Sequence, residues 1–411
     1  MKRVGMRPEN GHQARLLRLL RDIGPQSRAE LGELVELSKS KVAIELDRLS
    51  ELGFVDVVGL AASRGGRRSQ MVALSERLRF VGIDIGATSI DVAITDGELR
   101  LLGHGAQPTD VRSGPNAVLE QALDLVAKVR AELTGPVEDL AGVGVGVPGP
   151  VSQGEGALVA PPIMPGWSHF PLRDMLGAAL GAPVMVDNDV NIMTLGELHA
   201  GTARSVQDLL FVKVGTGIGC GIVVGGDVYR GVTGSAGDIG HIQVDDNGPV
   251  CSCGNTGCLE ACFGGAALAR EAEAAARTGR SPWLADRLAQ LLAGSGEPGV
   301  SGPSIGLTAR DVGAAAAAGD PVAVQLVRQG GHRLGRVLAS LVSFFNPALV
   351  VIGGGVAGLG HPLLAEIRSV VYRRSLPLAT GNLPIVLSEL GGTAGVVGAA
   401  RLVSDSVFKP I

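Results

Sequence analysis

The sequence predicts an α/β protein with a duplicated architecture, preceded by a smaller, mainly α domain. Two stretches share one plan, in which two strand-like runs flank a Gly/Thr turn: FVGIDIGATSIDVAITDG begins at Phe80 and LLFVKVGTGIGCGIVVGGDV begins at Leu209. The two turns lie about 130 residues apart, and such a matched pair indicates a repeated α/β unit. Before Phe80 the apolar residues recur at helical spacing, so we place a domain boundary between residues 79 and 80.

Length and composition describe a globular chain. With 411 residues, 45% hydrophobic and 18% charged, it is long enough for two or three domains. It has no apolar run of membrane-spanning length, and its first residues lack the apolar core of a signal peptide. We therefore expect a cytoplasmic protein with no membrane partner.

Charge is divided unevenly along the chain. Residues 1–80 contain 15 Lys and Arg against 10 Asp and Glu, a balance of +5. The other 331 residues contain 21 against 30, a balance of −9. We call residues 1–80 the head and the remaining residues the body. A basic head on an acidic body indicates that only the head binds a polyanion.

Three short helices are predicted in the head. Leucines at helical spacing mark a helix over residues 13–24, and Ser27 with Glu30 has the form of a capping box that begins a second helix. Ser38 can cap a third helix, which Gly53 ends. Two short helices joined by three or four residues, with a basic start to the second, are typical of a helix-turn-helix.

The third helix is predicted to contact bases near its start, with Ile44 against a thymine methyl group. The predicted DNA-contacting residues of this helix are Lys39, Ser40, Lys41 and Ile44. Glu45 and Arg48 are also expected to face outward.

A hairpin is predicted after the third helix. FVDVVGL and SQMVALS are strand-like and flank a tip that carries Arg64, Arg67 and Arg68 among glycines. Arginines on a narrow tip suit the minor groove of DNA. Charge, helix order and wing together predict DNA binding; a helical interaction module with a solvated basic loop is the alternative.

Polar residues follow a buried strand in the acidic body. The segment PVMVDNDVNIMTLGE places Asn188 and Asp189 at the carboxyl end of a strand, where α/β sheets bind ligands. Asp189 could instead be a helix cap and nothing more. The Gly/Thr turns at 86–88 and 215–217 can wrap backbone N–H groups around a phosphate, although tight turns also need Gly for structural reasons. The glycine run at 353–355 lets a nucleotide or a helix approach the backbone closely.

A zinc site is predicted in the stretch GDIGHIQVDDNGPVCSCGNTGCLE. Three cysteines and a histidine fall within 18 residues and form a complete tetrahedral ligand set. The ligands are His241, Cys251, Cys253 and Cys258. A disulfide plus a free thiol is the alternative. Cys262 is a spare ligand or, in the simpler interpretation, a small buried apolar residue.

Seven motifs together resemble the ROK family of repressors, open reading frames and kinases. They are DIGAT at 84–88, GVGVPGPV at 144–151, DNDVN at 187–191, GTGIGCG at 215–221, the G-x-x-G-H run ending at His241, CSCGNTGCLE at 251–260 and LVVIGGG at 349–355. The resemblance covers essentially the full length. The head resembles that of the transcriptional-regulator branch, which includes xylose and N-acetylglucosamine repressors.

The resemblance implies an actin-like fold with two α/β lobes around a cleft. It divides the chain into a winged helix-turn-helix domain at 1–79 and a ROK domain at 80–411. One lobe would comprise about 80–190 with 392–411, and the other about 191–391. The zinc would be structural.

The resemblance also implies roles for the site residues. Asn188, Asp189, Asp238, His241 and Glu260 would form the sugar site, with Asp189 as general base if the protein is a kinase. His241 would turn one ring nitrogen to zinc and the other to the sugar. The residues of a weak or vestigial site for ATP and Mg²⁺ would be Asp84, Gly86, Thr88, Gly215, Thr216, Gly217 and Gly354.

Two departures from the family pattern bear on function. Family kinases usually have DxGGT followed by Lys or Asn, whereas this chain has Ala87 and Ser89. A methyl group at the turn crowds a phosphate and weakens the kinase interpretation. Asp238 replaces the usual Glu, so the identity of the sugar stays open.

Three functions compete: a sugar-responsive transcription factor, an ATP-dependent sugar kinase with an extra domain, and an oligomerisation module stabilised by zinc. The head favours the first, because family members that are only kinases begin near the DIG strand. We expect a repressor of carbohydrate metabolism that binds a palindromic operator as a homodimer or homotetramer. A kinase, or a bifunctional protein, is the alternative, and free and phosphorylated sugars stay equally open.

Overall fold

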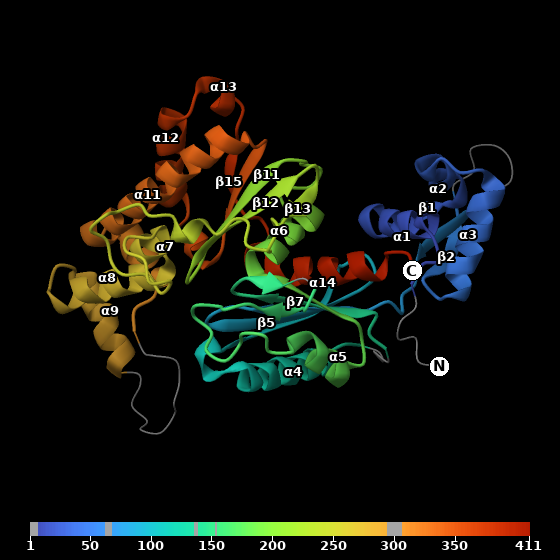
Figure 1. Cartoon of the computed structure of the whole chain (residues 1–411), viewed down its shortest axis with the longest axis horizontal. Coiled ribbons are helices and arrows are strands. Elements are labelled where there is room, and N and C mark those ends of the chain that lie inside the picture. The colour runs from blue at the N-terminus through green and yellow to red at the C-terminus, as the bar shows by residue number, and fades with distance from the viewer. Residues whose placement is uncertain (1–6, 62–67, 135–138, 153, 294–305) are drawn as a thin grey trace.

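A computed structural model describes residues 7–61, 68–134, 139–152, 154–293 and 306–411. In Figure 1 a small head lies beside one end of a larger body, whose two lobes lie on either side of helix α14 (Ala394–Val407).

The head contains the predicted helices and the two strands of the predicted wing, whose tip at 62–67 lies outside the described residues. Its elements are α1 (Gly11–Ile23), β1 (Gln26–Ser27), α2 (Arg28–Val35), α3 (Lys39–Glu51), β2 (Val55–Leu60) and β3 (Gln70–Leu74). The three strands form an antiparallel sheet in the order β1-β3-β2. Ser27 and Glu30 form the predicted capping box, and the Ser38 hydroxyl accepts a hydrogen bond from the Lys41 amide at 3.3 Å. Both predicted caps are therefore confirmed.

Each lobe is built on a five-stranded sheet with the same strand order. In the first lobe β4, β5 and β6 form an antiparallel meander, and β7 and β10 continue the sheet in parallel beside β4. In the second lobe β11, β12 and β13 form the meander, and β14 and β15 continue in parallel beside β11. The repeated order confirms the predicted duplication.

The strands of the first lobe are β4 (Phe80–Ile85), β5 (Ser89–Thr95), β6 (Leu101–Pro108), β7 (Gly142–Val147) and β10 (Val184–Asn188). Those of the second lobe are β11 (Leu209–Val214), β12 (Ile218–Val224), β13 (Asp227–Tyr229), β14 (Leu349–Gly353) and β15 (Ile385–Leu387).

Helices cover both faces of each sheet. In the first lobe α4 (Pro115–Ala131) and α5 (Leu172–Leu180) bury their apolar sides on one face, and α14 covers the other. In the second lobe α6 (Asp189–Ala200) covers the inner face. The outer core of that lobe is formed by α7 (Leu259–Phe263), α8 (Gly265–Arg277), α9 (Pro282–Ala293), α10 (Ala309–Ala317), α11 (Pro321–Phe345) and α12 (His361–Arg374). The two inner helices, α6 and α14, thus lie between the sheets.

Glycines bring α6 and α14 into backbone contact. A Cβ at Gly398 would lie 1.6 Å from the Ile192 carbonyl oxygen, and one at Gly196 would lie 2.2 Å from that of Ala394. Any larger side chain would therefore push the helices apart. The close crossing ties the two lobes together along their inner faces.

The head docks on α14 through a shared apolar core. Leucines of α1 and α3 belong to the same buried cluster as Val403, Val407 and Phe408. Arg21 is buried at this junction, where its Nη1 donates to Asp405 at 2.7 Å and its guanidinium lies 5.7 Å from the centre of the Phe408 ring. A fully buried arginine needs such partners, so the junction is specific.

The remaining described elements are short. They are β8 (Val151–Ser152), β9 (Ala157–Leu158), α13 (Pro377–Thr380) and the 3-10 helices η1 (Val111–Ser113), η2 (Ile239–His241), η3 (Gly355–Leu359) and η4 (Gly391–Thr393). Among the residues that the structure describes, no helix combines the length and apolar character needed to cross a membrane.

Candidate sugar site and metal centre

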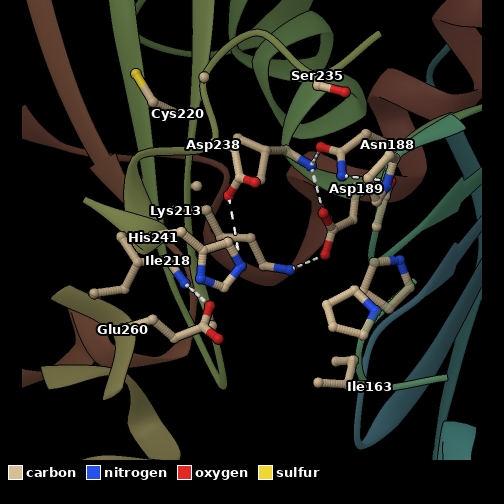
Figure 2. Close-up of a pocket in the computed structure, with 18 of the residues that line it drawn as sticks. Ile163, Asn188, Asp189, Lys213, Ile218, Cys220, Ser235, Asp238, His241 and Glu260 are labelled. Carbon is tan, nitrogen blue, oxygen red and sulfur yellow. Dashed lines mark hydrogen bonds and ion pairs between the residues drawn. The ribbon is translucent and has the colours of Figure 1, made fainter. Parts of the chain in front are cut away.

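A cavity of about 440 Å³ lies between the two lobes, within the range of roughly 300–1,000 Å³ that is usual for small-molecule sites. The first lobe contributes residues after β7 and the start of α6, and the second contributes the β11–β12 turn and the loop before η2. All five predicted sugar-binding residues line it: Asn188, Asp189, Asp238, His241 and Glu260. Figure 2 shows these side chains directed toward one space.

Asn188 and Asp189 stand at the junction of β10 and α6. The Asn188 side-chain oxygen accepts from the Val190 amide at 2.9 Å, and its Nδ2 donates to the Gly149 carbonyl at 3.1 Å. Asn188 is therefore the cap of α6, a role that we had considered for Asp189. One carboxylate oxygen of Asp189 also accepts from the Val190 amide, at 2.8 Å, and the other faces the cavity.

Lys213 forms an ion pair with the cavity-facing oxygen of Asp189. It is the last polar residue of β11 before the Gly/Thr turn, and its side chain is 20% exposed. Burial alone lowers the pKa of Lys213, but the negative charges of Asp189 and Asp84 outweigh burial and the net shift is upward. The cavity thus contains an ammonium group that is charged at neutral pH.

Asp84 lies at the end of β4, close enough to Lys213 and Asp189 for their charges to act on it. Burial raises the pKa of Asp84 to about 7; the positive charge of Lys213 opposes this rise and Asp189 adds to it. Its Oδ1 is buried and has no hydrogen-bond partner among the described residues. Asp84 is therefore a carboxyl group that is partly protonated at neutral pH.

The loop before η2 is held against β12 by a glycine. Gly237 has φ +91°, and a Cβ there would lie 1.7 Å from the Cys220 carbonyl oxygen. This contact sets the position of Asp238, whose half-exposed carboxylate lies 3.8 Å from Nε2 of His241. Beside this loop, Glu260 accepts a hydrogen bond from the Ile218 amide at 3.0 Å. The three side chains therefore enter the cavity from a fixed backbone.

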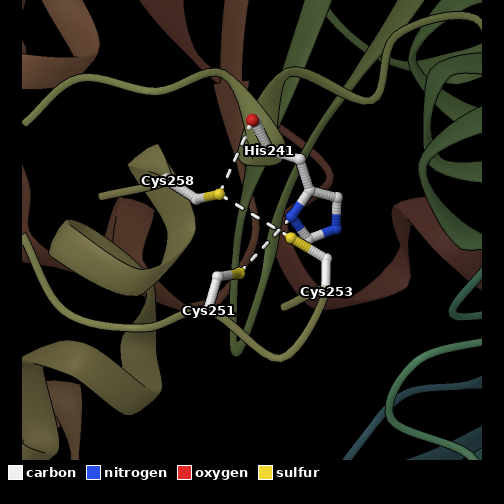
Figure 3. A group of neighbouring side chains, drawn as sticks. All are labelled: His241, Cys251, Cys253 and Cys258. Carbon is white, nitrogen blue, oxygen red and sulfur yellow. Dashed lines mark hydrogen bonds between the residues drawn. The ribbon is translucent and has the colours of Figure 1, made fainter. Parts of the chain in front are cut away.

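The four predicted zinc ligands converge beside the cavity (Figure 3). Their ligand atoms all lie within 4.8 Å of one another. The sulfurs of Cys253 and Cys258 are 3.7 Å apart, and the Cys251 sulfur is 3.5 Å from Nδ1 of His241. A tetrahedral zinc with Zn–S bonds of about 2.3 Å requires sulfur atoms roughly 3.8 Å apart, so the set fits this metal. Cys262 is not part of the cluster.

Known proteins resemble this chain in sequence and in structure. The model of the ROK family matches residues 80–406. The chain belongs to the ROK family. It is 29% identical over 387 residues to the xylose repressor of Caldicellulosiruptor bescii, with 93% of each chain covered.

Solved ROK structures share the fold. A ROK family transcriptional regulator, described as a homologue of the E. coli MLC protein, has a TM-score of 0.77 and 25% identity, with 96% of each chain covered. A ROK glucokinase from Streptomyces griseus, solved with glucose and AMPPNP, has a TM-score of 0.64 and 32% identity. The matched region covers 79% of this chain and 98% of the glucokinase chain. The predicted fold, an actin-like ROK domain behind a winged helix-turn-helix head, is confirmed.

The predicted nucleotide-binding residues are only partly brought together in this ROK chain. Thr216 and Gly217 line the cavity, and so does Ala87. A Cβ at Gly217 would lie 2.3 Å from the Glu260 carboxylate. Packing against Glu260 therefore also requires glycine at this position, whether or not a nucleotide binds. The predicted residues that do not line the cavity are Asp84, Gly86, Thr88, Gly215 and Gly354.

The predicted DNA-contacting residues of α3 lie at its exposed start. Ile44 is 63% exposed and is therefore accessible to a partner. Lys39, Ser40 and Lys41 are also exposed. On the wing, Arg68 is exposed, whereas Arg64 and Arg67 lie outside the described residues.

The expectation that Glu45 faces outward is wrong. Its carboxylate is buried and accepts hydrogen bonds from Gln13 at 2.9 Å and Asn10 at 3.1 Å, and Lys41 forms an ion pair with it at 2.8 Å. Glu45 thus joins α1 to α3. Helical spacing alone could not show this, because the amide partners come from another helix.

Two charged residues of the interior were not singled out from the sequence. Lys213 interrupts the apolar run LLFVKV just before the Gly/Thr turn, and this interruption was the available signal. Arg21 follows Leu17 by four residues and so falls on the apolar stripe of α1. Lys213 pairs with Asp189, which is distant in sequence, and Arg21 pairs with the distant Asp405 as well as with its neighbour Asp22.

Proposed function

We propose that this ROK protein is a DNA-binding transcriptional repressor of carbohydrate metabolism whose activity responds to a sugar. The observation that carries the proposal is the presence, in one chain, of a helix-turn-helix head with the two strands of a wing and of a polar cavity in the body. The full-length similarity to a xylose repressor and to a ROK regulator supports the same conclusion.

The sugar would be held by hydrogen bonds to its hydroxyl groups. Asp189, Asp238 and Glu260 supply acceptors, while Asn188 and His241 supply further polar atoms on the cavity wall. A pyranose offers several hydroxyls that each donate and accept, which suits such a set. The surrounding lining, which includes Pro148, Pro162 and Ile163, would contact the ring faces.

The charge of the cavity favours an uncharged sugar. Three carboxylates line it against one lysine, and that lysine is already paired with Asp189. A phosphate group would enter a field that is negative overall, at a cost that increases as water is excluded. We therefore favour the free sugar over its phosphate.

The metal would act as scaffold. Zinc, when bound, supplies a fixed anchor for Nδ1 of His241 and for the three thiolates. The protein residues then do the recognition: His241 directs Nε2 toward the cavity beside Asp238. The ring orientation is thereby set before the sugar arrives.

Helices α6 and α14 offer a route from the cavity to the head. α6 begins with Asp189 in the cavity, and near its other end Nε2 of His199 donates to the Glu98 carbonyl at 3.3 Å. Nδ1 of the same ring accepts from Arg401 of α14 at 3.2 Å, and Arg401 donates to Asp22 of the head at 3.1 Å. Closure of the lobes on a sugar would shift α6 and α14 and thereby the head. Such a shift requires that the sugar bind the two states with different affinity.

Operator binding would use a symmetric assembly. A homodimer or homotetramer places two heads on the half-sites of a palindromic operator. The start of α3 would enter the major groove and the wing would follow the minor groove.

A sugar kinase is the second candidate. The observation that favours it is the position of Asp189 beside the Thr216–Gly217 turn in one cavity, with the similarity to a glucokinase solved with AMPPNP. ATP with Mg²⁺ would then be the co-substrate, and Asp189 the general base.

One experiment separates the two functions. The full-length protein bound to its operator fragment is titrated with free sugars and with sugar phosphates, with and without Mg–ATP. We expect a free sugar to release the DNA without ADP formation. ADP formation that depends on the sugar would favour the kinase, and a DNA complex unaffected by every sugar would contradict the repressor.

A further inference from the structure

We propose that Lys213 is the positioning residue that fixes Asp189 as a hydrogen-bond acceptor and withholds it from proton abstraction, so that a bound sugar is recognised but not phosphorylated. This inference rests on the proposed sugar site. It explains how a family member can retain the carboxylate of the kinases and still act as a sensor.

The first argument is that both carboxylate oxygens of Asp189 already have a partner in the protein. One oxygen of Asp189 accepts from the Val190 amide at 2.8 Å, and the other is paired with the Lys213 ammonium. The Asp189 side chain is only 6% exposed. Each oxygen keeps one free lone pair, which is enough to accept a hydroxyl proton in a hydrogen bond.

The second argument is the charge around Lys213. The Asp189 carboxylate contacts this ammonium group, and the negative charge of Asp189, together with that of Asp84 in its ionised form, raises the pKa of Lys213. At neutral pH this lysine therefore keeps its proton and its ion pair with Asp189. Its ammonium group lies beside the Asp189 carboxylate, as Figure 2 shows.

The third argument concerns the chemistry of a base. A general base must take the proton of the attacking hydroxyl as phosphoryl transfer proceeds. Transfer of a proton to Asp189 would neutralise the carboxylate that Lys213 pairs with and would lose that ion pair, whereas a hydrogen bond donated by the hydroxyl leaves the ion pair in place. The hydroxyl proton thus stays on the sugar.

Two other roles for Lys213 predict different results. Its aliphatic stem could matter only for packing, in which case methionine would replace it without loss. Its ammonium could instead stabilise a transferring phosphoryl group, in which case the wild-type protein would form ADP and a neutral variant would not.

The test uses four variants of the full-length protein: Lys213→Met, Lys213→Arg, Asp189→Asn and the double variant Lys213→Met/Asp189→Asn. Thermal unfolding without ligand measures the coupling of the two residues. Calorimetry with D-glucose and D-xylose measures sugar affinity, and a coupled assay with Mg–ATP measures ADP formation.

We expect Lys213→Met to have a lower Tm than the double variant, because the single change leaves a buried carboxylate without its counter-ion. For a sugar that binds, Lys213→Met should weaken affinity about 10-fold or more, and Lys213→Arg should stay within about threefold of the wild type. The wild type should form no ADP above the background without sugar.

Additive Tm changes across the four proteins, or an unchanged sugar affinity in Lys213→Met, would overturn the proposal. So would ADP formation by the wild type that depends on sugar and is lost in Asp189→Asn. None of these measurements uses DNA, so a failure of the repressor function would be seen separately in the operator titration.

Discussion

His241 presents its two ring nitrogens to different neighbours. Nδ1 lies 3.5 Å from the Cys251 sulfur and Nε2 lies 3.8 Å from the Asp238 carboxylate. The metal cluster and the cavity therefore share one side chain. Loss of the metal should consequently disturb the position of His241 in the cavity as well as the geometry of the cluster.

Replacement of Cys258 by Ser tests this link. We expect the variant to lose bound zinc and to bind sugar about tenfold more weakly, because His241 loses its anchor. Metal analysis and calorimetry provide the two measurements. Cys262→Ser is the matched control and should keep its zinc, since Cys262 lies outside the cluster. A Cys258→Ser protein with full zinc content would contradict the ligand assignment.

Arg68 is the predicted DNA-contacting arginine of the wing that lies among the described residues, and it is exposed. Arg68→Ala should weaken operator binding and reduce the slope of log K against log salt by about one, because one phosphate or minor-groove contact is lost. Arg277→Ala, an exposed change at the end of α8 in the body, is the control. Equal salt slopes for Arg68→Ala and the wild type would show that the wing does not contact DNA.

At the scale of elements, the crossing of α6 and α14 depends on glycine. Gly398→Ala places a methyl group against the Ile192 carbonyl oxygen, and we expect a loss of about 1–3 kcal/mol or more in the free energy of unfolding. Chemical denaturation measures it. Gly392→Ala is the control, because a Cβ there meets nothing within 4 Å. Equal stabilities of the two variants would refute the close crossing.

The end of α6 makes the protein sensitive to acid. Burial lowers the pKa of His199 to about 4, and the positive charge of Arg401 contributes. The unfolded chain takes up a proton near pH 6.5, whereas the folded protein excludes it until about pH 4. The stabilising contribution is therefore present above pH 6.5 and is lost as the pH falls toward 4.

Comparison with His199→Gln isolates this effect from other titrating groups. From pH 7.5 to pH 5.5 the wild type should lose about 1 kcal/mol of unfolding free energy relative to the variant. Denaturant titrations at the two pH values measure the difference. Parallel changes in both proteins would mean that His199 does not titrate in this way.

At the scale of the whole molecule, Arg21 joins the head to the body. It is fully buried and donates to Asp405 at 2.7 Å and to Ser404 at 3.0 Å. Arg21→Met should leave operator binding in the absence of sugar within a few-fold of the wild type and largely abolish release by sugar, because it breaks the junction with α14.

Arg18→Met is the matched control for that experiment. Arg18 lies on the same helix but is exposed, so sugar should still release the DNA from this variant. Operator titrations with and without sugar provide the measurement. A normal sugar response in Arg21→Met would show that the signal reaches the head by another route.

Much of the local structure could be predicted from the sequence. The caps at Ser27 and Ser38, the strand that ends at Asn188 and the cysteine and histidine cluster all depend on short-range patterns, and the structure has them. The exposure of Glu45 was predicted wrongly for the opposite reason: its partners Gln13 and Asn10 lie on another helix. Spacing within one helix carries no information about them.

The sequence by itself determined the two-part organisation, the duplicated sheets and the ligand types of the metal site, because hydrophobic period, turn residues and metal-ligand chemistry are local. Tertiary structure alone decided which charged side chains form ion pairs. The pairing of Lys213 with Asp189 and of Arg21 with Asp405 joins residues 24 and 384 positions apart. Electrostatic energy depends on distance and burial, which only the packed chain defines.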